Sequence, residues 1–83
     1  MTVLLYTRRG CHLCERAEDL LAGRIAGLEL RDVDGHAAWR DRYGLRVPVL
    51  EVDGVVALEG RFDEDVVAGL LTRLSQAQFE PPA

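Results

Sequence analysis

The sequence has 83 residues, of which 48% are hydrophobic and 29% charged, and this balance predicts a globular chain long enough for one small domain. A formal net charge of −4 gives no reason to expect nucleic-acid binding. No apolar run has the length of a membrane span or of a signal-peptide core. Because only two cysteines are present, too few for a secreted disulfide scaffold, we expect a cytoplasmic protein.

The first predicted strand leads into both cysteines. Residues 2–6 are apolar and leucine-rich, which is typical of a strand buried on both faces. After a short loop, Cys11 and Cys14 stand at the start of a helix that we expect to end near Ala22. The unpaired N–H groups and the dipole at this end of a helix favour a thiolate, and the spacing lets the two sulfurs bond. The buried face of the helix is predicted to contain Cys14, Ala17, Leu20 and Leu21.

This pair of cysteines fits thiol–disulfide exchange better than other uses. A tetrahedral zinc site takes four ligands, and the chain has no second C-x-x-C, while His12 and His36 belong to different elements. We therefore predict no metal site. Cys11, nearer the start of the helix, is the expected nucleophile, and Cys14 is the expected resolving cysteine. His12 and Arg8 are expected to tune the reactivity of Cys11, since positive charge favours an anionic sulfur.

The middle of the chain predicts a second strand and a short helix. Residues 28–33 alternate imperfectly, which is typical of a strand near the edge of a sheet. Asp34 is the expected N-cap of a helix over residues 36–42. Trp39 and Tyr43 are four residues apart and therefore share one face of this helix, where we expect them to pack in the core.

A hairpin and a last helix follow. Residues 49–52 and 55–58 are rich in β-branched side chains and flank Asp53-Gly54, a strong hairpin signal. Asp63 is the expected cap of a helix that covers the sheet, and residues 76–83 are expected to be loose. The apolar stripe of this helix is predicted to consist of Val66, Val67, Leu70, Leu71 and Leu74.

The predicted order β-α-β-α-β-β-α gives one α/β domain over residues 1–75, with a parallel crossover and then an antiparallel hairpin. With its C-x-x-C at the start of the first helix, the chain resembles the glutaredoxin branch of the thioredoxin fold. The stretches that carry the resemblance are Tyr6–Cys14, Arg31–Asp34 and Tyr43–Val49. They are similar to the family's active-site stretch, its second strand, and the segment that leads to its cis-proline, here Pro48. The resemblance implies a four-stranded mixed sheet in the order 2-1-3-4, flanked by three helices.

The resemblance also implies a place for the substrate beside Cys11. A cis Val47-Pro48 bond would present the backbone of Val47 to an extended substrate, which could pair with it as an added strand. Arg46 would offer a guanidinium to a glutathione carboxylate. Gly60 and Asp63 stand in the segment that holds the other end of glutathione in the family.

The chain departs from the glutaredoxin pattern in that last segment. Glu59 brings a negative charge, and the bulky Arg61 and Phe62 stand where small residues give access to the pocket. We expect the phenyl ring of Phe62 to fill that pocket. The sequence therefore predicts weak or absent recognition of glutathione and no bound cofactor.

The chain looks most like the small bacterial glutaredoxin-like proteins. We predict a monomeric dithiol–disulfide oxidoreductase that acts on a disulfide-containing protein or small molecule, with a reductase or glutathione as electron donor and no membrane or nucleic-acid partner. Two alternatives remain open: a carrier of a [2Fe–2S] cluster held by Cys11 and glutathione between two chains, and a non-catalytic interaction module on the same fold.

Overall fold

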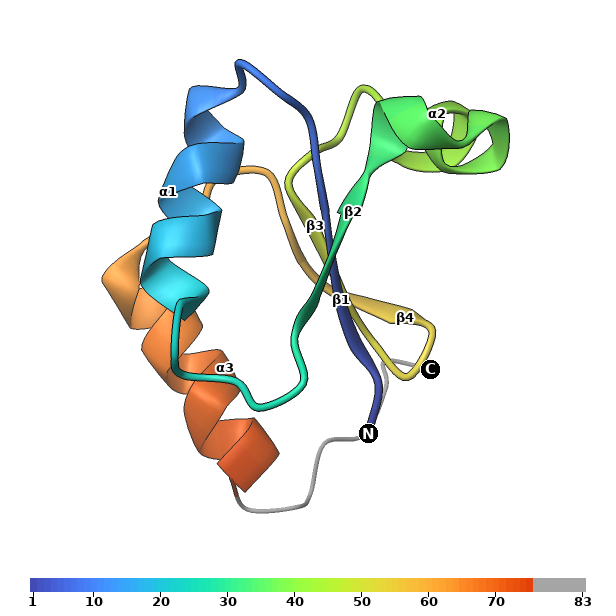
Figure 1. Cartoon of the computed structure of the whole chain (residues 1–83). Coiled ribbons are helices and arrows are strands. Elements are labelled where there is room, and N and C mark those ends of the chain that lie inside the picture. The colour runs from blue at the N-terminus through green and yellow to red at the C-terminus, as the bar shows by residue number, and fades with distance from the viewer. Residues whose placement is uncertain (76–83) are drawn as a thin grey trace.

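The computed structural model describes residues 1–75, which form strands and helices in the predicted order (Figure 1). The elements are β1 (Val3–Thr7), α1 (His12–Leu21), β2 (Glu29–Asp32), the 3₁₀-helix η1 (Val33–Gly35), α2 (Ala37–Tyr43), β3 (Val49–Val52), β4 (Val55–Glu59) and α3 (Glu64–Ser75). The prediction that residues 76–83 are loose lies outside the described residues. No helix among the described residues is both long and apolar enough to cross a membrane.

The four strands form one mixed sheet in the order β2-β1-β3-β4, as predicted. β1 is parallel to β2 and antiparallel to β3, and β2 lies at an edge. Asp53 and Gly54 both adopt positive φ angles, 52° and 83°, which a type I′ hairpin turn requires. Tyr6 is paired with Val49, so the end of β1 and the start of β3 lie at the same end of the sheet.

The sheet is covered on both faces, with α1 and α3 on one side and α2 on the other (Figure 1). The α1–α3 side contains the larger core, in which Leu5 and Leu50 of the sheet pack against α1 and α3. Alternate residues of the same strands, Tyr6 and Val49, belong to a second core together with Tyr43 of α2. This alternation follows from the period of two in a strand, and it explains why β1 reads as apolar on both faces.

Two expectations about helix ends and faces are wrong. Asp34 does not cap α2: it lies inside η1, where the side chain of Asp32 accepts a hydrogen bond from its N–H. The N-cap of α2 is His36, whose Nδ1 accepts from the N–H of Ala38 at 3.2 Å. On α3, Val66 is 40% exposed and lies outside the buried stripe, because it is rotated by about 100° round the helix from the buried Val67.

A carboxylate is buried on the α2 side of the sheet. Glu51 of β3 is 5% exposed, and its carboxylate accepts a hydrogen bond from the hydroxyl of Tyr43, the last residue of α2. Buried charges are tolerated where they are hydrogen-bonded, and this bond meets that requirement. Burial, and then the adjacent Glu51, raise the pKa of Tyr43 to about 12.

Candidate functional site

The two cysteines lie at the N-terminus of α1, where the helix begins. Cys11 is the N-cap, and its Sγ accepts a hydrogen bond from the N–H of Cys14 at 3.1 Å. The structure joins the two residues as a disulfide, with their Cα atoms 5.2 Å apart. In a reduced pair, the same N–H would point at the Cys11 sulfur and favour its thiolate, together with the helix dipole.

The two sulfurs differ in access to solvent, as the sequence predicts. Cys11 is half-buried, whereas Cys14 is 1% exposed and packs on the inner face of α1. His12 lies between them in sequence but its side chain is 98% exposed, with Nδ1 at 3.6 Å from the carboxylate of Glu15. His12 therefore faces solvent and Glu15, and a tuning effect on Cys11 remains a prediction.

The loop that leads into β3 supplies the other side of the candidate site. The Val47-Pro48 peptide bond is cis, as predicted. Pro48 is fully buried, and its carbonyl accepts a hydrogen bond from the N–H of Gly60 at 2.9 Å. Within residues 1–75, the N–H and the C=O of Val47 form no backbone hydrogen bond, so both are available to an extended chain.

Arg8 is committed to the scaffold. Its Nε and Nη2 donate to the two carboxylate oxygens of Asp34 at 2.9 and 3.0 Å, and its Nη1 donates to the carbonyl of Gly44 at 2.9 Å. Hydrogen bonding to Arg8 lowers the pKa of Asp34. All three nitrogens of the guanidinium are in use, so Arg8 ties the loop before Cys11 to the end of α2. Its predicted tuning role would have to act through that charge pair.

Arg46 is also paired, but less completely. Its Nε donates to the carboxylate of Glu59 at 2.6 Å, and its guanidinium lies 5.3 Å from the centre of the Tyr43 ring. The hydrogen bond to Arg46 lowers the pKa of Glu59. Both charged side chains are 45% exposed, so the pair lies at the surface beside Pro48.

The segment after β4 differs from the expectation at Phe62. Gly60 has a φ of 78°, which permits the turn that brings its N–H to Pro48. Asp63 caps α3 as predicted, with its carboxylate accepting from the N–H of Val66 at 2.9 Å. Phe62, however, does not stand in an open pocket: it is 1% exposed and belongs to the larger core. An apolar side chain is favoured at position 62, because the segment between β4 and α3 packs against the larger core.

Sequence reasoning missed two exposed leucines next to the site. Leu13 lies between the cysteines and is 43% exposed, and Leu45, in the loop before Pro48, is fully exposed. Single exposed apolar residues are common on protein surfaces. Here one belongs to the cysteine segment and the other to the loop that leads to Pro48. Neither leucine belongs to a periodic apolar pattern in the sequence, so their exposure could not be predicted from it.

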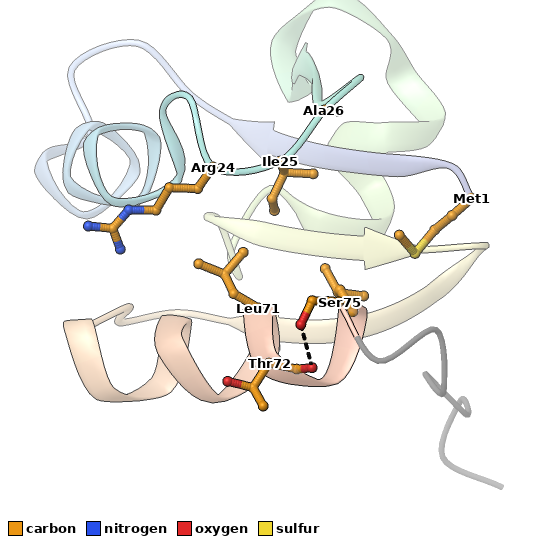
Figure 2. A pocket seen from close by; sticks show the side chains of 8 residues that line it. Met1, Arg24, Ile25, Ala26, Leu71, Thr72 and Ser75 are labelled. Carbon is orange, nitrogen blue, oxygen red and sulfur yellow. Dashed lines mark hydrogen bonds between the residues drawn. The ribbon is translucent and has the colours of Figure 1, made fainter.

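One open pocket lies apart from the cysteine site. Figure 2 shows an open pocket between the segment after α1 and the end of α3, with Ile25 and Leu71 in its lining. Met1, Arg24 and Thr72 also line it, so it lies at the opposite end of the sheet from Cys11. Within residues 1–75, no group of three or more histidine, cysteine, aspartate or glutamate side chains gathers where it could hold a metal ion.

Comparison with known proteins agrees with this geometry. Residues 2–72 match the model of a family described as Glutaredoxin-like domain (DUF836). The chain is 38% identical to the Northeast Structural Genomics target protein XcR50 from X. campestris, whose X-ray structure superposes with a TM-score of 0.72 over 86% of this chain and 96% of that one. A mutant thioredoxin from Halobacterium salinarum NRC-1 is 29% identical, with a TM-score of 0.60 over 98% of this chain and 77% of the thioredoxin. No curated protein matches the sequence. The predicted thioredoxin-like fold is confirmed.

Proposed function

Because this chain belongs to the glutaredoxin-like domain family DUF836, and its cysteine pair has the C-x-x-C spacing, we propose that it is a dithiol–disulfide oxidoreductase. The observation that carries the proposal is the arrangement at the start of α1. There the accessible Cys11 receives an N–H hydrogen bond on its sulfur, and the buried Cys14 lies one turn behind it. A structural disulfide would need neither the accessible sulfur nor the N–H group directed at it.

The reaction begins with both cysteines reduced. The Cys11 thiolate attacks one sulfur of a substrate disulfide; a Cys11–substrate bond forms, the substrate S–S bond breaks, and the departing thiolate takes a proton from water. Cys14, as a thiolate, then attacks the Cys11 sulfur and releases the second substrate thiol. The substrate gains two electrons, and the protein is left with the Cys11–Cys14 disulfide, the state of the structure.

Renewal of the dithiol needs an external thiol. Either a protein dithiol or glutathione, as an electron donor, would attack the Cys11 sulfur, because Cys14 is covered by the inner face of α1. A second equivalent of the same thiol then resolves the mixed disulfide and restores both cysteines. The same exposure therefore makes Cys11 the residue that exchanges with both substrate and donor.

The loop before β3 would orient the substrate. The unpaired N–H and C=O of Val47 can each form one hydrogen bond with an extended segment, as in the addition of a strand to a sheet edge. Leu13, between the two cysteines in the chain, and Leu45, in the loop before Pro48, offer exposed apolar side chains for contact with a substrate. These features support an extended protein segment as substrate, with its disulfide next to Cys11.

The test is a single-turnover exchange with a peptide that contains one disulfide. The reduced protein, freed of reductant, is mixed with the peptide, and intact-mass spectrometry follows peptide reduction and protein oxidation together. We expect equal amounts of reduced peptide and oxidised protein for the native chain, a trapped protein–peptide adduct for Cys14→Ser, and neither for Cys11→Ser.

The same experiment separates the proposal from its alternative. A native dithiol that stays reduced beside an excess of peptide disulfide, with both cysteines slow to alkylate at neutral pH, would mean a non-catalytic module. An adduct that forms on Cys14 in the Cys11→Ser variant would reverse the roles of the two residues.

A further inference from the structure

The Arg46–Glu59 ion pair lies beside Pro48, where the proposed substrate would bind. Arg46 precedes Pro48 by two residues, and Glu59 is the last residue of β4, where it is paired with Val49. The next residue, Gly60, donates its N–H to the carbonyl of Pro48. The ion pair therefore connects the two segments on either side of Pro48, next to the unpaired backbone of Val47.

Arg46 could bind a substrate carboxylate, but its guanidinium is already paired with Glu59. Its guanidinium is 45% exposed and lies over the ring of Tyr43, which limits its movement. Only its Nε has a hydrogen-bond partner within residues 1–75, so its terminal N–H groups are open to a ligand. A substrate carboxylate bound to the terminal N–H groups of Arg46 would share the guanidinium with the carboxylate of Glu59 at Nε. The two like charges would repel each other.

Two other candidate receptors near this end of the sheet are filled in the same way. Each of the three guanidinium nitrogens of Arg8 already donates a hydrogen bond, to Asp34 or to a backbone carbonyl. The N-terminus of α3 already receives the carboxylate of Asp63. Asp34 accepts two hydrogen bonds from Arg8 and Asp63 caps α3, whereas Glu59 accepts a single hydrogen bond, from Arg46. Of the three carboxylates, Glu59 is therefore the one whose removal should disturb the fold least.

We propose that Glu59 is a specificity-determining residue: it neutralises Arg46 beside Pro48 and disfavours substrates that bring a carboxylate to that position, in favour of extended protein segments without an acidic residue there. The inference rests on the proposed oxidoreductase function and specifies its substrate class. Glutathione, a small peptide with two carboxylates, belongs to the disfavoured class.

The test compares Glu59→Gln with Glu29→Gln. Glu29 makes a surface ion pair of the same kind, with Arg31 at 3.2 Å, but on the opposite edge strand of the sheet. Each protein is assayed with two mixed disulfides of one short peptide, one carrying glutathione and one carrying a neutral cysteine peptide amide. We expect Glu59→Gln to raise the ratio of kcat/KM for glutathione over the neutral adduct by about two- to fivefold, the range of an exposed ion pair, and Glu29→Gln to leave that ratio unchanged.

A binding measurement keeps the inference separate from the redox chemistry. Titration of the oxidised proteins with S-methylglutathione, which cannot exchange disulfides, should show tighter binding to Glu59→Gln than to the native chain, and the double variant Arg46→Gln/Glu59→Gln should lose that gain. Equal binding to the native and Glu59→Gln proteins would overturn the proposal. So would a gain that survives in the double variant, since the receptor would then be another cation such as Arg61. Absence of turnover with both adducts would contradict the oxidoreductase function, while the titration would still decide the role of Glu59.

Discussion

Replacing Tyr43 by Phe tests how the loop before Pro48 is held. Tyr43 is 4% exposed, and its hydroxyl donates to the buried carboxylate of Glu51. Its backbone carbonyl also accepts from the N–H of Arg46 at 2.8 Å, so the same residue starts the loop. The Tyr43→Phe change keeps the ring in place and removes only the donor, which leaves the carboxylate without its partner.

The expected loss of stability follows from that unpaired carboxylate. A hydrogen bond to a charged group contributes about 1.5–3 kcal/mol, and we expect Tyr43→Phe to lower the free energy of unfolding by about that amount at neutral pH. A separate, pH-dependent effect follows from the pKa of Tyr43, which burial and then Glu51 raise from 10.0 to about 12. This difference corresponds to roughly 3 kcal/mol of stability between neutral and strongly alkaline pH. The folded chain keeps a proton that the unfolded chain releases above pH 10, so this stability is present below pH 10 and is lost as the pH rises through about 12.

Urea unfolding measures both effects. Trp39 is the only tryptophan and lies in the partly buried shell of the core that contains Tyr43, so its fluorescence reports on this region. Tyr6→Phe is the matched control: within residues 1–75 the hydroxyl of Tyr6 bonds only to Arg31, whose partly exposed guanidinium can bind water instead, so we expect a loss below about 1 kcal/mol. Removing the carboxylate as well, in Tyr43→Phe with Glu51→Leu, should recover part of the loss. Equal stability of Tyr43→Phe and the native chain at pH 7 would refute the reasoning, as would the same decline in stability above pH 10 in both proteins.

Three further outcomes are expected. Brief alkylation of the reduced protein at neutral pH should label Cys11 before Cys14, and peptide mapping reports the order; label mainly on Cys14 would contradict the difference in burial. Asp34→Asn should remove a part of the stability that is present above the ordinary pKa of 3.8 and is lost below it, because Arg8 lowers the pKa of Asp34 in the folded chain; acid unfolding curves with the same midpoint for both proteins would speak against this. Gly44→Ala should destabilise the protein by about 1–3 kcal/mol in thermal unfolding, since its Cβ would lie 2.5 Å from a carbonyl oxygen of α2 and 3.3 Å from Arg8; an unchanged melting temperature would mean that the helix end relaxes freely.

The fold could be predicted largely from local signals. Period-two alternation, the Asp53-Gly54 turn and the apolar face of α1 each depend on residues close together in sequence. The errors fell where two local solutions compete. Asp34 and His36 can each cap the short helix, and the choice depends on Arg8, 26 residues away from Asp34, which binds that carboxylate. Such a distant partner is invisible to a pattern read along the chain.

The redox cysteines of the site could be predicted from the sequence, but the contacts of the residues around them could not. The C-x-x-C spacing at a helix start indicated a redox pair, because it is a short pattern with a physical cause, whereas the role of Pro48 followed from the resemblance of Tyr43–Val49 to the glutaredoxin segment. The partner of Arg46 did not follow from the sequence. Glu59 was expected only as an unfavourable negative charge, whereas the structure places its carboxylate in direct contact with the guanidinium.

The site depends on two loops whose relative position is maintained by contacts behind them. The loop before Cys11 is attached through Arg8 to the carbonyl of Gly44, and the loop before Pro48 begins at that same glycine. The side chain of Arg8 therefore links the two loops directly. Because neither loop has strand or helix hydrogen bonds of its own, a change at Arg8 would shift the cysteine segment relative to Val47 without touching a sulfur. Loss of exchange activity in an Arg8 variant would thus measure the alignment of the two loops, and it should affect large substrates that contact both loops more than small disulfides that contact Cys11 alone.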